Sequence, residues 1–454
     1  MPYGRGSIDF QTFYPTSLLV TGFDILFFWV ARMIMLGCWF ALDAPLPDGR
    51  KRELKDAVPF KDVYIHALVR DANREKMSKT KGNVIDPIEI VKKYGTDAVR
   101  FTLASMASPG TDIAFNEART EGYRAFANKI WNAARFLFMN VDRAAEIGIT
   151  VDPAALSGMP TVAGDAPLEA RWIVAEFHKT AAEVNQSLAN YRFDDAANTI
   201  YQFFWGSFCD WYLEIVKLRL DFTETADKAA TKAALTTFVQ VFEASLRLLS
   251  PFMPFLTEEI WQAVYEGNTP VKSIALTKFP QSEISSDNTS TNEAMSKMND
   301  IQEAVVAIRA MRKDAQVPEK EKVNVLVHIV PDTHQGSAKL IIDNEKLIGS
   351  LARVESLELT QSFPSPQSPI RSMRYYSLSL QYEKSIDIPA ERERLTKEIA
   401  KLEKNLAAAE RQLGNEAFMA KAPAHIVEGL KKQESENRQL LEKAKAALAA
   451  LPNM

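Results

Sequence analysis

Residues 76–83 read Lys76-Met77-Ser78-Lys79-Thr80-Lys81-Gly82-Asn83. This lysine-rich loop closes on a Gly-Asn turn. It leads into a helix that Asp86 can cap, with Pro87 at its first position and Gly95 at its end. Lysine acts as a mobile point charge, which suits a polyphosphate whose charge shifts during a reaction. A solvated basic turn would have the same composition, so the interpretation depends on the residues on either side.

The residues just before this loop predict a buried strand. Residues 62–69 form a β-prone apolar run of the kind found in parallel sheets that are covered on both faces. A strand, a charged loop and a capped helix make half of a doubly wound sheet, where ligands bind beyond the carboxyl ends of the strands. His66 lies near that end, either at a ligand site or as a hydrogen-bonded interior histidine.

A second strand-to-helix junction lies upstream. Leu18-Leu19-Val20 predicts a short buried strand, Thr21-Gly22 predicts a turn, and Asp24 falls in the first turn of the helix that follows. Glycine lets a ligand approach the backbone, and an aspartate beyond a strand can accept hydrogen bonds from ribose hydroxyls. Asp24 could equally be a helix-capping acid.

Residues 18–42 also have about the length of a membrane span. Asp24 and Arg32 interrupt the run, and a charge at bilayer depth is costly. We therefore expect no membrane association and a helix that is buried inside an α/β core.

These segments together resemble the valyl-tRNA synthetase family of the class I aminoacyl-tRNA synthetases. Residues 76–80 are similar to the KMSKS signature of the class, with Thr80 in place of the final serine. Residues 21–33 resemble the valyl version of the preceding catalytic segment, where isoleucyl and leucyl enzymes have different residues. The similarity continues through residues 126–136 and 208–213 to a hairpin like the valyl C-terminal arm, so it covers nearly the whole chain.

The resemblance implies binding sites for ATP and valine. The expected ATP-binding residues come from three segments and are Gly22, Asp24, His66, Lys76, Met77, Ser78 and Lys79. Lys76 and Lys79 would be the catalytic residues, because they would stabilise the charge that grows on the departing pyrophosphate. Gly22 and Asp24 would hold the ribose and His66 would border the nucleotide, while Trp29 would wall the amino-acid pocket. ATP would enter with Mg²⁺, although no carboxylate identifies itself as a metal ligand.

Two features of the family are not found in the sequence. None of the five histidines lies in a HIGH-type motif, and nothing resembles the inserted editing domain. We infer the C-terminal portion of a longer valine-specific ligase for tRNA(Val), which would lack an N-terminal catalytic half and would be a monomer in its complete form. The net charge of −4 requires that RNA contacts come from local basic patches. Only two cysteines, Cys38 and Cys209, far apart, favour a reducing, cytoplasmic compartment, and no zinc or other protein-bound metal is expected.

Patterns along the chain predict four parts. Residues 1–113 would be the α/β remnant of a Rossmann-like class I catalytic domain, and residues 114–275 an all-α helical bundle that binds the anticodon. Residues 276–385 would hold a linker and a small α/β module. Residues 386–454 would form an antiparallel coiled-coil hairpin that acts as a tRNA-binding arm, although a plain structural arm or a dimer zipper would have the same pattern.

Periodicity gives the elements within these parts. Helices are predicted over residues 117–141, 168–188, 193–220, 228–249, 293–313 and 338–351, and a helix capped by Thr96-Asp97 is predicted to about residue 107. Strands are predicted over residues 323–330, 357–359 and 378–380. Aromatic residues at helical spacing predict a bundle core that includes Phe203, Phe204, Phe208, Trp211 and Tyr212. The hairpin seams would be Leu395, Ile399, Leu402, Leu406, Ala409 and Leu413, and Ile426, Leu430, Gln433, Asn437, Leu440, Ala444, Ala447 and Leu451.

The expected tRNA-binding residues are Lys129, Arg135 and Phe136, whose positions match residues that face the anticodon stem-loop in the family. Unpaired bases stack on aromatic rings, and lysine and arginine bind phosphates. The alternative is that Phe136 belongs to the bundle core and that both cations are solvated.

Two other functions remain open at this stage. One is a ligase for isoleucine or leucine, against which residues 21–33 and the terminal hairpin argue. The other is an inactive RNA-binding remnant, which the missing HIGH-type motif favours. An adjacent upstream reading frame that encodes the HIGH and editing segments would support a split or truncated ligase.

We predict that this chain alone does not activate valine, because half of the catalytic pattern is missing. The measurement is ATP–pyrophosphate exchange by the purified 454-residue protein. Valine-dependent exchange above background would refute the prediction.

Overall fold

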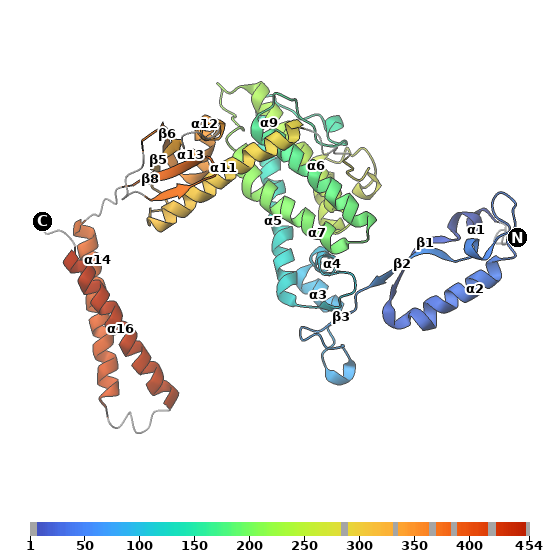
Figure 1. Ribbon diagram of the computed structural model, residues 1–454, viewed down its shortest axis with the longest axis horizontal. Helices are drawn as coiled ribbons and strands as arrows, with labels where there is room; N and C mark the ends of the chain where they lie inside the picture. Colours follow the sequence, from blue (N-terminus) through green and yellow to red (C-terminus); the bar gives the residue numbers. More distant parts are fainter. Residues whose placement is uncertain are drawn as a thin grey trace.

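The computed structural model describes residues 7–282, 289–329, 335–362, 369–382, 388–415 and 424–450. A small α/β unit comes first and is followed by a group of long helices, a second α/β unit and a pair of helices near the C-terminus (Figure 1).

Two parallel strands form the core of the first unit. Strand β1 (Thr16–Gly22) pairs in parallel with β2 (Phe60–His66). Their register sets Gly22 opposite His66, so both strands end at the same edge. The predicted strand over residues 62–69 is therefore divided: β2 ends at His66, and β3 (Val69–Arg70) pairs instead with β4 (Ile113–Ala114).

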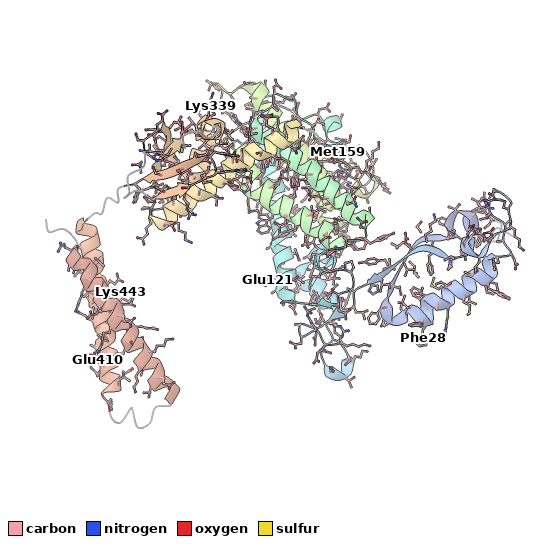
Figure 2. All side chains as sticks on the ribbon, viewed as in Figure 1. Phe28, Glu121, Met159, Lys339, Glu410 and Lys443 are labelled. Atoms are coloured by element: carbon pink, nitrogen blue, oxygen red, sulfur yellow. The ribbon has the colours of Figure 1, made fainter. Side chains whose placement is uncertain are left out.

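The helical segment after β1 is exposed rather than buried. It consists of η1 (Phe23–Ile25), the π-helical η2 (Leu26–Val30) and α2 (Ala31–Ala41). Phe27, Phe28 and Trp39 are 85%, 72% and 74% exposed, and Phe28 is labelled on this segment in Figure 2. The expectation of a helix buried in an α/β core is thus wrong for the described residues, because no described element covers this apolar face. By length and composition alone, Phe23–Ala41 is also a candidate membrane span.

The helix that follows the lysine-rich loop begins and ends as predicted. In α3 (Pro87–Tyr94), the Asp86 carboxylate accepts a hydrogen bond from the Ile88 N–H at 2.8 Å, and Pro87 occupies the first turn. Gly95 ends the helix with a φ of 90°, a conformation that favours glycine. This helix anchors the C-terminal end of the loop.

Asp97 caps a different helix from the one predicted. Helix α4 (Thr96–Ser105) starts after Gly95 without a side-chain cap. The Asp97 carboxylate instead accepts hydrogen bonds from the Leu256 N–H at 2.6 Å and the Phe255 N–H at 3.4 Å, at the start of α10 (Pro254–Val264). Burial raises the pKa of Asp97, although these two N–H groups oppose the effect. The contact ties the first unit to the helical bundle.

The long helices bury the predicted aromatic core. The remaining helices of the bundle are α5 (Glu117–Glu146), α6 (Leu168–Ala189), α7 (Phe193–Gln202), η6 (Phe203–Tyr212), α8 (Leu213–Val216) and α9 (Lys228–Leu249). Phe203, Phe204, Phe208 and Tyr212 are buried as predicted, whereas Trp211 is half-buried. The helix predicted over residues 193–220 is not uniform, since residues 203–212 are π-helical and the helix ends at Val216.

The second α/β unit continues the core of the bundle. Its elements are α11 (Thr289–Asp314), β5 (Val323–Ile329), α12 (Gln335–Asp343), α13 (Glu345–Ala352), β6 (Val354–Thr360), β7 (Ile370–Ser372) and β8 (Tyr376–Gln381). The sheet has the order β6-β5-β8-β7. Three features differ from the prediction: α11 begins at Thr289 rather than at residue 293, the helix predicted over residues 338–351 is divided into α12 and α13, and β7 was not predicted. His328 on β5 is a hydrogen-bonded interior histidine, bonded to Ser379 Oγ at 2.7 Å.

The terminal helices α14 (Ile388–Leu413) and α16 (Ala424–Ala450) pair in antiparallel directions. Lys445 Nζ lies 2.7 Å from Glu403, and Arg438 lies 3.0 Å from Glu410. The partner of the later residue on α14 is therefore the earlier residue on α16, so the two helices run in opposite directions. This confirms the predicted hairpin for the described residues; the connection over residues 416–423 lies outside them.

The seam of the hairpin is predicted correctly on one helix and shifted on the other. On α14 all six predicted positions are buried or half-buried, and Arg392 is half-buried in addition. On α16, Glu434 and Leu441 occupy the seam instead of Gln433 and Leu440, which are exposed. Asn437 is at the seam as predicted, and its Nδ2 is buried without a hydrogen-bond partner. Ile426, Ala447 and Leu451 lie outside the residues whose side chains are described.

Replacing Asp97 by alanine should lower the free energy of unfolding by about 1–2 kcal/mol, because two partly buried N–H groups at the start of α10 lose their acceptor. Urea unfolding followed by circular dichroism measures the change. Asp227→Ala is the control, since Asp227 caps only its own helix α9 and is exposed. Equal midpoints for Asp97→Ala and the unmodified chain would contradict the role of this contact.

Candidate nucleotide site and RNA-binding surface

Gly22, Asp24 and His66 meet where β1 and β2 end. A Cβ atom added to Gly22 would lie 2.7 Å from Asp24 Oδ1 and 3.6 Å from His66 Cε1. Any side chain at position 22 would therefore displace the carboxylate. Three of the predicted ATP-binding residues, from two segments of the sequence, are thus brought together by the parallel register.

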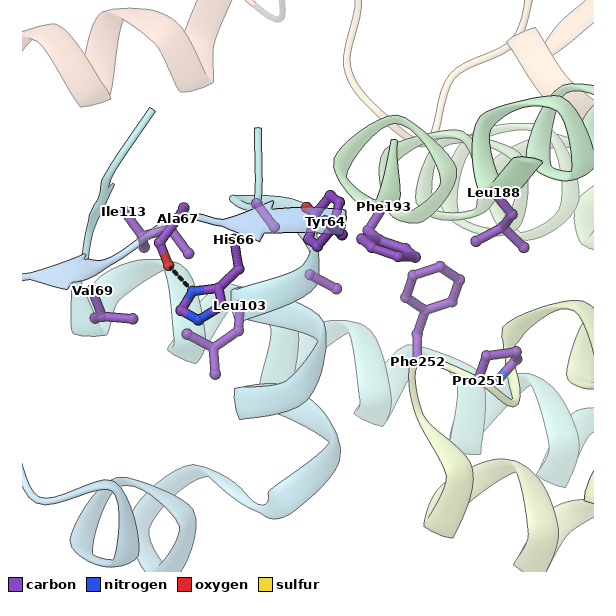
Figure 3. A pocket seen from close by; sticks show the side chains of 12 residues that line it. Tyr64, His66, Ala67, Val69, Leu103, Ile113, Leu188, Phe193, Pro251 and Phe252 are labelled. Atoms are coloured by element: carbon purple, nitrogen blue, oxygen red, sulfur yellow. Dashed lines mark hydrogen bonds between the residues drawn. The ribbon is translucent and has the colours of Figure 1, made fainter. Parts of the chain in front are cut away.

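His66 is exposed, so the alternative of an interior histidine is wrong. Its Nδ1 lies 2.9 Å from the Ala67 carbonyl oxygen, as the dashed line in Figure 3 marks. Because a carbonyl oxygen can only accept, Nδ1 carries the proton, and Nε2 of the neutral ring remains an acceptor. His66 can therefore accept a hydrogen bond from a ligand hydroxyl or amino group.

An apolar cavity of about 450 Å³ borders His66 on the side of the helical bundle (Figure 3). Tyr64 contributes one wall, and its ring packs edge-on against Phe193 with centroids 5.3 Å apart. Leu188 and Phe252 line the cavity from the bundle. The residues that line it include no lysine or arginine, so the cavity is unsuited to phosphate groups.

The lysine-rich loop holds two free ammonium groups. Ser78 caps the short helix η4 (Lys79–Lys81), and Gly82 adopts the left-handed conformation that the predicted turn requires. Lys81 Nζ is paired with Glu75 at 3.0 Å. Lys76 and Lys79 are exposed, and their ammonium groups have no hydrogen-bond or ion-pair partner among the residues that the structure describes. Two of the three loop lysines are thus available to an anion.

The described conformation does not join the loop to the edge formed by β1 and β2. In Figure 1 the loop after β3 extends below α3, whereas the edge lies where the segment leading into α2 begins. No hydrogen bond or ion pair connects Lys76, Met77, Ser78 or Lys79 with Gly22, Asp24 or His66 in the described part of the chain. Trp29 lies on η2, downstream of Asp24, and is 45% exposed.

Of the three predicted tRNA-binding residues on α5, Arg135 is the most accessible. Lys129 Nζ lies 3.0 Å from Asp210 Oδ1 and 5.1 Å from the centroid of the Trp205 ring. Phe136 is half-buried, with its ring 5.9 Å from that of Phe238 and 5.5 Å from Lys217 Nζ.

Trp131 is an exposed aromatic residue that the sequence analysis missed. Its side chain is 45% exposed, and it lies four positions before Arg135 on α5, so both occupy one face of the helix. The signal was present in the sequence, because Phe126, Ile130 and Leu137 define the buried face of this helix and Trp131 falls outside it. The Arg135 guanidinium has no hydrogen-bond or ion-pair partner among the residues that the structure describes. An exposed tryptophan beside such a group is suited to stacking on an unpaired base and contacting a phosphate.

The chain matches three families of known proteins. Residues 2–116 match the class I tRNA synthetases (I, L, M and V), residues 170–327 the anticodon-binding domain of tRNA ligase, and residues 387–452 the valyl tRNA synthetase tRNA binding arm. These matches define a class I tRNA synthetase chain. Helix α5 lies between the first two matched ranges.

Relatives in this class are valine–tRNA ligases. Those of Solibacter usitatus and Syntrophotalea carbinolica are 42% and 41% identical to it over 93% of this chain, and that of Aquifex aeolicus is 38% identical over 98%. The chain therefore belongs to the valine–tRNA ligase family. It spans 43%, 43% and 36% of the length of these three relatives, which is less than half.

Proposed function

We propose that this chain contributes the nucleotide-binding loop, the anticodon-binding bundle and the tRNA-binding arm of a valine–tRNA ligase. The complete enzyme would form valyl-adenylate from valine and ATP, release pyrophosphate, and transfer valine to the 3′ end of tRNA(Val). The observation that carries the proposal is the assembly of Gly22, Asp24 and His66 at the carboxyl edge of a parallel strand pair, in a chain related to such ligases over more than nine tenths of its length.

Asp24 and His66 would bind the nucleoside part of ATP. The Asp24 carboxylate can accept from ribose hydroxyls, and Gly22 leaves room for that carboxylate beside the backbone. His66 Nε2 would accept from the same ligand. Trp29 would wall the amino-acid pocket, and an apolar wall distinguishes amino acids that differ by one methylene only weakly.

Lys76, Lys79 and the neighbouring residues Met77 and Ser78 would contact the phosphates. As the α-phosphate is attacked, negative charge grows on the leaving pyrophosphate. A free ammonium group therefore stabilises the transition state more than it stabilises bound ATP. Mg²⁺ would enter with ATP as part of the substrate. The loop would have to approach the edge of β1 and β2 for this step, and the mobile reach of lysine suits such a closure.

The exposed apolar face of η2 and α2 would be covered by the remaining catalytic half of the ligase. Parallel strands occur almost only in sheets that are covered on both faces. Phe27, Phe28 and Trp39 together form a large exposed apolar patch, and patches of this kind usually mark a surface that contacts another part of a protein. The part of the relatives that this chain does not span is long enough to supply the missing layers. Such an enzyme would act in the cytoplasm, where Cys38 and Cys209 stay reduced.

On α5, Arg135 would bind a tRNA phosphate and Trp131 would stack on an unpaired base, with Lys129 and Phe136 supporting this face. The α14–α16 hairpin would lean on the body of the tRNA.

Replacing Lys76 and Lys79 together by alanine should weaken the binding of inorganic pyrophosphate to this chain by about 10-fold or more, because both free ammonium groups are lost. Isothermal titration calorimetry measures the affinity. Lys81→Ala is the matched control and should have a smaller effect, because Glu75 already neutralises that lysine. Undetectable pyrophosphate binding by the unmodified chain, or equal losses for both variants, would contradict the proposal.

Trp131→Ala should weaken the binding of tRNA(Val) by about 10-fold, since base stacking on one aromatic ring contributes on the order of 1–3 kcal/mol. Arg135→Ala should also weaken binding and reduce the dependence of affinity on salt concentration. Filter binding at several salt concentrations gives both quantities. Phe136→Leu, a substitution in a half-buried ring, should leave the salt dependence unchanged. If Trp131→Ala binds like the unmodified chain, base stacking on this face is ruled out.

A further inference from the structure

The two ends of the lysine-rich loop are joined by one side-chain hydrogen bond. Asn83 Nδ2 donates to Asp71 Oδ2 at 2.8 Å, across twelve positions of the chain. Both side chains are half-buried. The hydrogen bond from Asn83 is the main reason that the pKa of Asp71 lies below its ordinary value, so the carboxylate is charged and the bond is of the stronger, charge-assisted kind.

Each partner of this bond also holds the loop backbone. Asp71 Oδ1 accepts from the N–H groups of Glu75 at 2.8 Å and Asn73 at 3.0 Å. Asn83 Oδ1 accepts from the Ser78 N–H at 2.9 Å. We name the pair Asp71 and Asn83 the loop clamp. Asp71 holds the backbone of residues 73 and 75, which precede Lys76, and Asn83 holds the backbone of Ser78, which lies between Lys76 and Lys79. The bond between Asp71 and Asn83 connects these two sets of contacts.

The positions of Lys76 and Lys79 depend on this backbone. Their ammonium groups have no partner among the described residues, so no side-chain contact orients them. Ser78, which the clamp holds, lies directly between Met77 and Lys79 and caps the helical turn that contains Lys79. Without the clamp, the ammonium groups of Lys76 and Lys79 would no longer be held in a fixed position relative to each other.

We infer that Asp71 and Asn83 are positioning residues that present Lys76 and Lys79 together to the pyrophosphate group of the nucleotide. This inference rests on the proposed function. Neither Asp71 nor Asn83 would contact the reacting atoms; both would act through the backbone of the loop.

The inference and simple electrostatics predict opposite signs for one substitution. Asp71→Asn removes a negative charge beside a cationic loop, which by charge alone should tighten anion binding. Loss of positioning should weaken anion binding. The amide introduced at position 71 cannot accept from the Asn83 amide and the two backbone N–H groups together, because its nitrogen is a donor. Glu75→Gln is the matched charge control: it removes a negative charge beside the loop, while Glu75 bonds to Asp71 through its backbone N–H and carbonyl groups, which the substitution keeps.

A rescue variant separates positioning from general damage. Asp71→Asn combined with Asn83→Asp exchanges the amide and the carboxylate across the same bond. The amide oxygen at position 71 can still accept from the Asn73 and Glu75 N–H groups, and the carboxylate at position 83 can still accept from Ser78. The double variant loses the longer bond of 3.4 Å from Asn83 Nδ2 to the Lys76 carbonyl oxygen. The double variant also restores the net charge of the loop.

The first test follows opening of the loop by tryptic cleavage after Lys76 in the folded 454-residue chain. Asp71→Asn should accelerate cleavage by about 10- to 100-fold, the effect of one lost charge-assisted bond on an opening equilibrium. The double variant should return to nearly the original rate, and Glu75→Gln should stay near it. Cleavage of Asp71→Asn at the original rate, or no rescue in the double variant, would overturn the clamp.

The second test measures the affinity for inorganic pyrophosphate by calorimetry. Asp71→Asn should bind about 5-fold more weakly or worse, the double variant should recover, and Glu75→Gln should bind as tightly as the unmodified chain or more tightly. Equal or tighter binding by Asp71→Asn would overturn the positioning role. If the unmodified chain fails to bind pyrophosphate, the proposed function fails, while the cleavage test still decides whether the clamp exists.

Discussion

The in-register parallel pairing of β1 with β2 is the constraint on which the candidate site depends. It places the last residue of each strand, Gly22 and His66, side by side at one edge. The absence of a side chain on Gly22 then lets the Asp24 carboxylate approach the backbone. A shift of one residue in the register would move His66 away from this edge and turn alternate side chains to the opposite face.

The same pairing explains the most unusual surface of the chain. A parallel strand pair and its crossing helix present apolar residues on both faces, and in this structure Phe27, Phe28 and Trp39 remain exposed. The chain spans less than half the length of the valine–tRNA ligases compared above, and this exposed surface is the one that we propose the remaining part of the ligase covers. By contrast, the bundle and the second α/β unit share one core, so the face of α5 that is proposed to bind tRNA rests on a well-packed scaffold.

The features that were predicted correctly are those that residues close together in the sequence determine. Asp86 caps a helix two positions away, and the α14 seam follows a simple repeat, so both predictions are confirmed. Features set by distant contacts were missed: Asp97 caps α10 across 159 positions, and at the α16 seam Glu434 and Leu441 replace the predicted Gln433 and Leu440. At the candidate site, the residue types at the strand ends were predicted, but their mutual distances and the Asp71–Asn83 bond depend on the folded loop.

The central claim is that two free ammonium groups stabilise the pyrophosphate as it leaves, more than they stabilise bound ATP. The direct measurement is steady-state valine-dependent ATP–pyrophosphate exchange by a full-length valine–tRNA ligase that carries these 454 residues, with Lys76 and Lys79 replaced by alanine. Transition-state stabilisation predicts that kcat falls by about 100-fold or more while the KM for ATP changes by less than about threefold. A kcat within about twofold of the unmodified ligase would contradict it.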